Sequence, residues 1–385
     1  MLGPMPTTAL RETLRGLAGC PDTGPPVVSL YLDARKDDPT RRKVTQIFVR
    51  HRLKDIQDAQ RRYPAHANSL AEDAAKIRDA LDARLAPGRT AEGQGLVLFS
   101  SSGRGLWTRI EAPRPFANRL IIRQVPHLLQ LVRMTGIFRE ALLCQADSRS
   151  ARILEFDFGT LEGEFTISHP EIPGRHAQGG WSQTRYQRRI DWQRERHLRE
   201  VAETFVQLAD QRPAARLIIS APPEPLALLR AVLPRRILER NPVDIHLKPG
   251  VDLSAISQVM LWLLERLAAK DNEVRRIRIF AEATKSGTDI GVEACCRAAN
   301  AGAIEELLIQ DRLERLGWRC RDCGLLDPGR SPGSCPACSS KLVRCDLTAR
   351  LAEKVLAEGG YVAVIDGGRL LKQAGGMIAH LRFRV

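Results

Sequence analysis

Apolar and polar positions recur along the chain with the periods of strands and of helices, which predicts a mixed α/β protein. In the first part, the apolar run at residues 27–33 predicts a buried strand. Residues 96–112 read as a hairpin with a Ser/Gly turn. Apolar positions at helical spacing predict helices at 41–62 and 69–85, and three prolines make 113–127 a predicted crossing linker.

The middle of the chain repeats this mixture. Residues 141–172 alternate over three predicted short strands, and the Gly-rich polar loop 174–183 precedes a predicted helix at 184–210. A core stripe at spacings of three and four runs along that helix, through Leu198, Val201, Phe205 and Leu208. Residues 216–234 then predict strand, Pro-rich turn and helix.

The last part is again strands among helices. Helices are expected at 254–277 and 347–360, a helix, Gly turn and strand at 291–310, and a strand at 361–367. Alternating elements indicate α/β units. We therefore expect three domains, at residues 1–138, 139–248 and 249–385.

The net charge of the chain indicates which class of partner it binds. Lys and Arg number 59 and Asp and Glu 45, a net charge of +14. Such an excess suits a polyanion, most often nucleic acid, although compositional drift toward arginine is the alternative. The N-terminus has neither the basic start nor the apolar centre of a signal peptide, and no run is long enough to cross a membrane. We expect a cytoplasmic protein with no membrane partner.

The nine cysteines include one strong motif. Cys320-x-x-Cys323 and Cys335-x-x-Cys338 are separated by eleven residues rich in Gly, Pro and Ser. Two such knuckles can place four thiolates around one ion, and this double spacing predicts a structural Zn²⁺ site with no open position. A pair of redox dithiols is the alternative. Cys345 is not expected to be a ligand, and Cys20, Cys144, Cys295 and Cys296 are expected to be buried small apolar residues.

A basic segment follows the Gly-rich loop. Arginines fall near one face of the predicted helix, with an aromatic among them, and the candidate RNA-binding residues are Arg175, His176, Arg185, Arg188, Arg189, Trp192, Arg196 and Arg199. Guanidinium forks suit phosphates, and an aromatic can stack on a base. The alternative is a basic helix face that is exposed to water and binds no partner. The usual phosphate-loop, zinc-protease and nucleophile-elbow motifs are absent from the sequence.

This segment resembles the middle domain of the archaeal and eukaryotic class-1 peptide-chain release factors. Gly179-Gly180 match the two glycines of the family's Gly-Gly-Gln loop, Arg185-Tyr186 match its Arg-aromatic pair, and Val201–Leu208 match the continuation. Residues 303–310, the cysteine pairs, 347–354, 361–366 and 375–383 look like the third domain of archaeal release factors and of Pelota. The resemblance to a bacterial homologue of this family implies three domains, the last an L7Ae-like α/β/α sandwich with a zinc insertion at about 318–345.

One departure from the family decides the expected activity. The family's catalytic Gln follows the glycines directly and helps to place a water at the peptidyl-tRNA ester, but Trp181 stands there. Gln183 is the candidate catalytic residue if it takes that role, and the candidate peptidyl-transferase-centre loop is Gly179, Gly180, Trp181, Ser182 and Gln183. A Trp cannot orient water as an amide does.

The resemblance implies a ribosome-binding factor. It would occupy the A site, contact large-subunit rRNA and place the loop at the peptidyl-transferase centre, in ribosome hibernation or rescue. A peptidyl-tRNA hydrolase that uses Gln183 is one alternative, and an RNA-binding protein that does not act on ribosomes is another. tRNA and a translational GTPase, such as an elongation factor, are further candidate partners.

Overall fold

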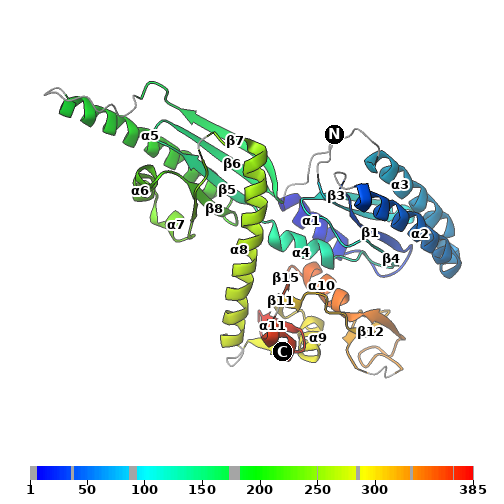
Figure 1. Cartoon of the computed structure of the whole chain (residues 1–385). Helices are drawn as coiled ribbons and strands as arrows, with labels where there is room; N and C mark the ends of the chain where they lie inside the picture. Colours follow the sequence, from blue (N-terminus) through cyan, green and yellow to red (C-terminus); the bar gives the residue numbers. More distant parts are fainter. Residues whose placement is uncertain are drawn as a thin grey trace. The chain divides into compact units, whose positions relative to one another are not determined.

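The computed structural model in Figure 1 describes residues 7–35, 39–85, 93–172, 183–248, 250–282, 287–329, 333–366 and 368–384. The chain divides into two units: Met1–Ile137 with Arg266–Val385, and Phe138–Glu265. The described residues form four β-sheets together with helices, which confirms the predicted α/β class. The domain boundaries at residues 139 and 249 stay a prediction.

The first sheet is formed by the N-terminal segment and has the strand order β3-β2-β1-β4. Its strands are β1 (Val27–Asp33), β2 (Gly95–Ser101), β3 (Leu106–Ala112) and β4 (Arg119–Arg123). Neighbouring strands are antiparallel, and Leu30 of β1 lies opposite both Leu98 of β2 and Leu120 of β4. The predicted strand at 27–33 and hairpin at 96–112 are confirmed.

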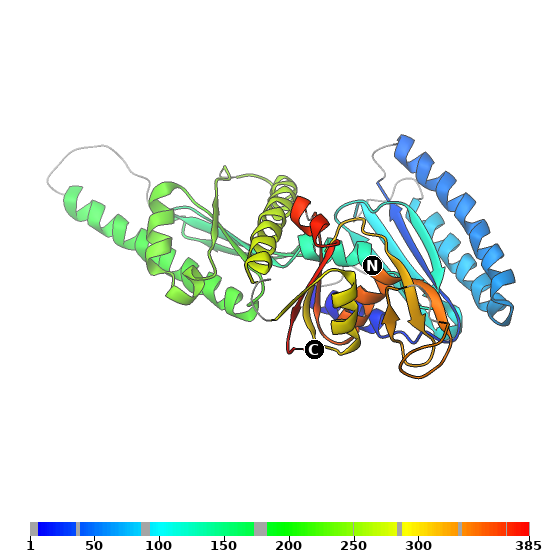
Figure 2. The same ribbon diagram turned by 90° about the horizontal axis from the view of Figure 1, so that it is seen from below.

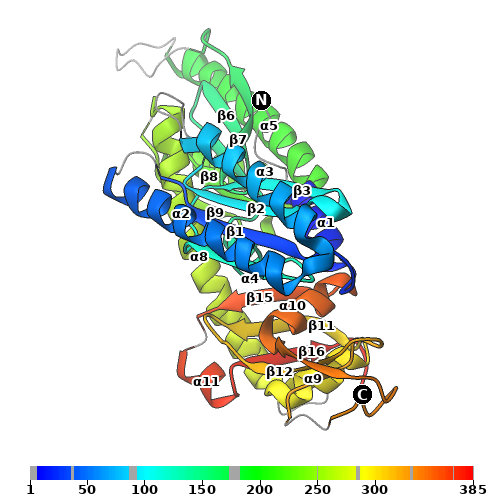
Figure 3. The same cartoon turned by 90° about the vertical axis from the view of Figure 1, so that its right-hand side faces the viewer.

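Two long helices cover one face of this sheet, as Figures 2 and 3 show. They are α2 (Pro39–Arg62) and α3 (Ala67–Leu85), joined through the 3-10 turn η1 (Pro64–His66). Ile56, Leu70 and Ile77 of these helices are fully buried in one cluster with the apolar side chains of β1 and β2. Burial of each such side chain contributes about 1.5–3 kcal/mol. The segment is completed by α1 (Thr7–Ala18), η2 (Ser102–Arg104) and α4 (Leu129–Ile137).

The linker predicted at residues 113–127 is wrong in its central part. Arg119–Arg123 form β4, an edge strand whose partner among the described residues is β1. The prolines at 113, 115 and 126 flank this strand and do not interrupt it, so they remove no N–H from the ladder. The prolines therefore lie at the two ends of a strand, and they do not indicate a linker without secondary structure.

The second unit contains a five-stranded sheet with the order β7-β6-β5-β8-β9. Its strands are β5 (Ala141–Ala146), β6 (Ser150–Asp157), β7 (Thr160–Ser168), β8 (Arg216–Ser220) and β9 (Val243–Ile245). Strands β5, β6 and β7 form an antiparallel meander, whereas β8 and β9 run parallel to β5. The three short strands predicted in 141–172 are confirmed.

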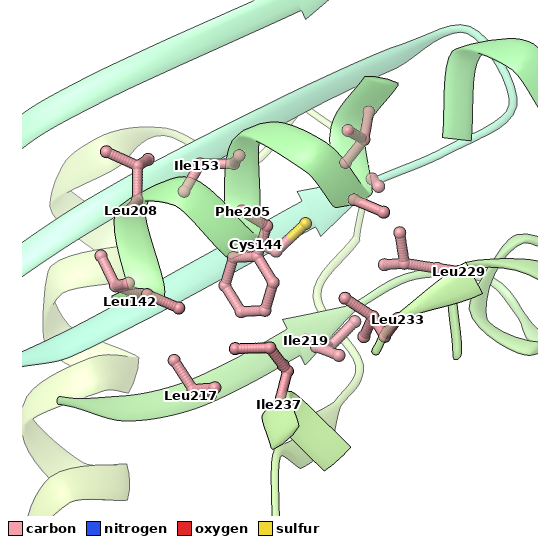
Figure 4. Packing of buried hydrophobic residues seen from close by; sticks show 14 of the residues in the cluster. Leu142, Cys144, Ile153, Phe205, Leu208, Leu217, Ile219, Leu229, Leu233 and Ile237 are labelled. Atoms are coloured by element: carbon pink, nitrogen blue, oxygen red, sulfur yellow. The ribbon is translucent and has the colours of Figure 1, made fainter. Parts of the chain in front are cut away.

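Helices α5 (Gln183–Gln211), α6 (Pro223–Val232) and α7 (Arg235–Leu238) pack on this sheet. Figure 4 shows Phe205 of α5 among Leu142 and Cys144 of β5 and Ile219 of β8. The stripe that the spacing predicted is the side of α5 that faces the strands, because its four members are all buried. The sheet therefore fixes which face of α5 is left to solvent.

The C-terminal segment forms a four-stranded sheet with the order β10-β16-β11-β15. Its strands are β10 (Thr288–Ile290), β11 (Ile304–Gln310), β15 (Tyr361–Ile365) and β16 (Met377–Leu381). Strand β11 is parallel to β15, and β16 is antiparallel to β10 and β11. Helix α8 (Leu253–Glu282) begins in the second unit and ends in this part, whose other helices are α9 (Val292–Asn300), α10 (Leu347–Ala357) and α11 (Gly368–Gln373).

A small sheet is inserted in the chain between β11 and α10. Its strands are β12 (Leu316–Cys320), β13 (Leu326–Asp327) and β14 (Leu342–Asp346), in the order β13-β12-β14. The insertion ends at Asp346, whose carboxylate accepts a hydrogen bond from the Ala349 N–H at 3.1 Å and caps α10. The cysteine pairs of the sequence motif lie in this insertion.

Buried ion pairs connect the N-terminal and C-terminal segments of the first unit. Arg123 of β4 donates to Glu353 of α10 at 2.8 Å, and both side chains are largely buried. Asp22 pairs with Arg350 of α10 at 2.8 Å and with Arg319 of β12. These ion pairs join residues far apart in the sequence.

Candidate nucleic-acid interface and metal centre

Helix α5 has an apolar face toward the sheet and a basic face toward solvent. Its exposed side chains include Arg188, Arg189, Trp192, Arg196 and Arg199. At about 3.6 residues per turn these positions share one side of the helix, opposite the buried Val201 and Phe205. The structure thus brings together, on one exposed strip, five of the residues proposed from the sequence to bind RNA.

The aromatic residue of this strip is itself exposed. Trp192 keeps 59% of its surface accessible, so packing against the sheet does not explain why an aromatic residue stands at this position. The guanidinium carbon of Arg196 lies 5.7 Å from the centroid of the Trp192 ring. This geometry fits a cation–π contact, which holds a flat aromatic surface beside a positive charge.

The charges of the strip are only partly neutralised within the protein. Arg199 pairs with Glu195 at 2.7 Å, one helical turn away. Arg188 and Arg189 have no acidic partner among the described residues. Arg194 differs, because its side chain is only 10% exposed and its guanidinium lies 3.9 Å from Asp191. Arg188 and Arg189 are therefore free to meet an external anion.

Several proposed residues lie outside the described part of the chain. They are Arg175, His176, Gly179, Gly180, Trp181 and Ser182. The backbone of Gln183 and of Arg185 belongs to the first turns of α5, and their side chains lie outside the described set. The sequence-based roles of these eight residues stay predictions.

The structure adds a polar cluster that the sequence did not suggest. His169, just after β7, contacts Glu171 at 3.0 Å and Glu200 of α5 at 2.9 Å. The hydrogen bonds to Glu200 and Glu171 raise the pKa of His169. The His197 ring packs edge-on against His169 at 5.2 Å, and burial lowers the pKa of His197. No local pattern could reveal this cluster, because Glu200 is 31 positions from His169.

Helix α2 carries a second basic surface. Lys43, Arg50, Lys54 and Arg62 are exposed on it and have no acidic partner among the described residues. The sequence shows eight basic and two acidic residues between 41 and 62, but only the fold identifies which of them avoid ion pairs. This surface adds to the positive potential that would attract a polyanion.

The four motif cysteines converge at one end of the inserted sheet. Cys320 ends β12, Cys323 lies in the following turn, and Cys335 and Cys338 lie in the turn before β14. Their sulfur atoms all lie within 4.8 Å of one another. The Cys320 and Cys338 sulfurs are 3.3 Å apart, and those of Cys323 and Cys335 are 3.6 Å apart. Four sulfur donors at these separations can hold one metal ion.

The surroundings favour the thiolate at Cys338, whereas burial and hydrogen bonds among the cysteines raise the pKa of Cys323. The Ala337 N–H lies 3.4 Å from the Cys335 sulfur, as a donor to it. Hydrogen bonds from Ser340, first from its backbone, lower the pKa of Cys338 to about 6. Thiolate is the form that binds metal, and a closed set of four suits Zn²⁺. The donor set therefore fits the ion that the spacing predicts.

The other cysteines are not part of this cluster. Cys144, Cys295 and Cys296 are buried, as expected, whereas Cys20 is only half-buried. Cys345 lies on β14 opposite Gly317 and belongs to no metal-binding group found in the described residues. Burial raises the pKa of Cys144 to about 12 and of Cys345 to about 11, which disfavours their thiolates at neutral pH.

Among the described residues, no helix combines the length and the apolar character needed to cross a bilayer.

Residues 126–265 match the family model of bacterial archaeo-eukaryotic release factor family 10. This match includes the five-stranded sheet and helix α5. None of the curated proteins matches the chain.

Several solved structures also match the chain, all at low sequence identity. The archaeal translation termination factor aRF1 is 15% identical, with 99% of each chain covered and a TM-score of 0.26. A chain of the model of ribosome-bound archaeal Pelota and ABCE1 is 14% identical over 100% of this chain and 96% of that one, with a TM-score of 0.40. Dom34 of S. cerevisiae is 12% identical over 75% of this chain and 81% of its own, with a TM-score of 0.36. Over residues 126–265, this chain is similar to the bacterial proteins of archaeo-eukaryotic release factor family 10.

Proposed function

We propose that this protein is a cytoplasmic ribosome-binding factor that occupies the A site and places the loop of residues 174–183 at the peptidyl-transferase centre. Its role would be ribosome hibernation or rescue of stalled ribosomes. The observation that carries the proposal is the exposed basic strip of α5. The strip follows this loop directly in the chain, within the segment that matches the release-factor family.

Electrostatics supports RNA as the partner. Arg188 and Arg189 lack acidic partners in the described structure, and Trp192 offers an exposed ring beside them. Arginine forks match phosphate oxygens, and an exposed indole can stack on a base. With the basic surface of α2 and a net charge of +14, binding would depend strongly on salt.

The proposed metal is a structural Zn²⁺ held by Cys320, Cys323, Cys335 and Cys338. The supporting observation is the convergence of four sulfurs within 4.8 Å. Cys320 and Cys335 share a small buried cluster with Leu342, and the inserted sheet has only three short strands. A metal would therefore supply stability that so small a core cannot provide.

Release of the nascent peptide is the alternative activity. Gln183 is the first residue of α5, where the loop meets the helix, and its amide would have to orient a water at the peptidyl-tRNA ester. In the case of hibernation, Trp181 anchors the loop and no bond is broken. tRNA and a translational GTPase remain candidate partners in either case.

Co-sedimentation with 70S ribosomes tests the proposal. A triple variant, Arg188→Gln, Arg189→Gln and Arg196→Gln, should bind more weakly than the wild type. Arg235→Gln is the matched control, because Arg235 is 91% exposed on α7 and already paired with Glu239. RNA binding without ribosome binding would instead favour the non-ribosomal alternative. Peptide release from stalled ribosomes would identify a hydrolase.

A further inference from the structure

A cavity in the second unit is not used by the basic strip or by the loop. It has a volume of about 290 Å³ and lies at the carboxyl ends of the parallel strands β5, β8 and β9. Figure 1 labels β5 and β8, and Figure 3 labels β9. Strands β5 and β8 are neighbours in the sheet although β6 and β7 separate them in the chain. In α/β sheets, ligands bind at the carboxyl ends of strands, where the strand order breaks in this way.

The surface of the cavity is mainly apolar, and polar side chains also line it. Ala151, Ala221, Pro222 and Leu247 supply apolar surface, and Ser168 and Ser220 contribute hydroxyl groups. Ligand sites combine an apolar wall with a few polar groups in this manner. A volume near the lower end of the usual range suits a molecule no larger than a nucleotide.

One guanidinium in the cavity is held in place without being neutralised. The Nη2 of Arg152 donates to the side-chain oxygen of Gln145 at 2.7 Å and to the carbonyl of Val251 at 2.9 Å. Both acceptors are neutral, and no carboxylate within the described residues forms an ion pair with Arg152. A fixed guanidinium with no counter-charge is a site for an anion.

The acidic side chain that lines the cavity, Asp147, accepts hydrogen bonds from neighbouring residues of its own turn. Asp147 accepts the N–H groups of Arg149 at 2.7 Å and Ser150 at 2.8 Å, and the Ser150 hydroxyl at 3.0 Å. These bonds close the turn between β5 and β6. The Asp147 carboxylate thus has a structural role, and Arg152 is left to face a ligand.

We propose that this cavity binds a single nucleotide, with its phosphate on Arg152 and its base against the apolar wall. The nucleotide is either free in solution or turned out of an RNA strand. The free-nucleotide case is independent of the proposed function, and the RNA case rests on it.

Calorimetric titration of the full-length protein with AMP, GMP, CMP and UMP at millimolar concentrations is the primary test. At least one should bind, and Arg152→Gln should weaken it about 10- to 100-fold, as loss of a charge-assisted hydrogen bond would. Arg149→Gln is the matched control, since it removes the same charge from an exposed position outside the cavity. Ala221→Leu keeps Arg152 but fills the cavity and should also weaken binding.

The two sources are distinguished by 70S co-sedimentation. If Arg152→Gln lowers ribosome affinity and free nucleotide competes with ribosomes, the nucleotide belongs to RNA. If ribosome affinity is unchanged, the ligand is a free nucleotide. Absence of binding by all four nucleotides, or equal binding by the wild type and folded Arg152→Gln, overturns the proposal. The α5 triple variant tests the ribosome proposal separately, because its residues lie outside this cavity.

Discussion

The guanidinium of Arg196 lies over the indole of Trp192, 5.7 Å from the ring centroid, on the solvent side of α5. This pair places the only described aromatic ring of the helix's basic strip next to a charge and away from the core. An exposed Trp costs solubility unless a partner covers it. A nucleic acid bound at this pair would therefore be stabilised both by stacking of a base on the indole and by attraction of a phosphate to the guanidinium.

Neutralising the strip should lower both affinity and its dependence on salt. We expect replacement of Arg185, Arg188, Arg189 and Arg196 by Gln to reduce the slope of log K against log [salt]. The reduction should be about 0.7–0.9 for each phosphate that the variant no longer binds. Ribosome binding at several salt concentrations measures this slope. A slope equal to that of the wild type would mean that the strip is a solvated face only.

Metal analysis tests the cysteine centre. Purified protein should carry about one Zn²⁺ per chain, because four thiolates complete one tetrahedral site. Cys335→Ser should lower the metal content and loosen the inserted sheet, as seen by faster proteolysis within it. Cys20→Ser is the control, since Cys20 is half-buried and outside the cluster. Fully folded protein that never contains metal would contradict this expectation.

The loop variants separate anchoring from catalysis. If Trp181 stacks on a base, Trp181→Ala should lose about 1–3 kcal/mol, roughly one to two orders of magnitude in ribosome affinity. If Gln183 orients water, Gln183→Ala should abolish peptide release and leave affinity nearly unchanged. We favour anchoring, because a two-residue offset moves the amide about 7 Å along an extended chain. Strong wild-type release that disappears in Gln183→Ala would make this protein an enzyme.

The His169 cluster predicts a pH-dependent contribution to stability. Glu200 and Glu171 raise the pKa of His169 above its ordinary value of 6.5. Its contribution is therefore complete below that ordinary value and is lost as the pH rises through the higher folded pKa. His197, whose pKa burial lowers, acts in the opposite direction and loses its contribution as the pH falls.

The melting temperatures of the wild type and His169→Gln measure this effect. Their difference should be larger at about pH 6 than at about pH 9, because only the wild type carries the titrating imidazolium. His197 is present in both proteins, and burial, the main cause of its lowered pKa, is common to them; only the smaller effect of the His169 charge on His197 is lost in the variant. A difference that does not vary with pH would show that the ring contributes by packing alone.

The buried ion pair between Arg123 and Glu353 should be important for stability. Glu353→Gln removes the carboxylate closest to Arg123, which keeps only Asp346 at 3.9 Å, and one of the two carboxylates that pair with Arg350. Removal of one partner of a buried pair costs about 3–5 kcal/mol, whereas an exposed pair contributes about 0–1 kcal/mol. Urea unfolding of Glu353→Gln and of Glu358→Gln, whose pair with Lys354 is more exposed, gives the comparison. Equal urea midpoints for the two variants would show that the Glu353 ion pair contributes no more to stability than the exposed pair.

Local patterns determined the elements and the metal ligands. The period of the apolar residues predicted α2, α3 and α5, because the side of a helix that packs must repeat every three to four positions. The cysteine spacing predicted the four sulfurs that the fold brings within 4.8 Å, because a knuckle is set by its own few residues. Both signals lie within short stretches of chain.

Contacts between distant stretches were decided by the tertiary structure alone. The sequence could not show that His169 meets Glu200, or that Arg152 is held by Gln145 and Val251. It also missed β4, since pairing with β1 and not proline content decides that strand. Periodicity records which side of an element is buried, but the partner across a sheet or a cavity depends on how separate elements pack, and no local pattern encodes that.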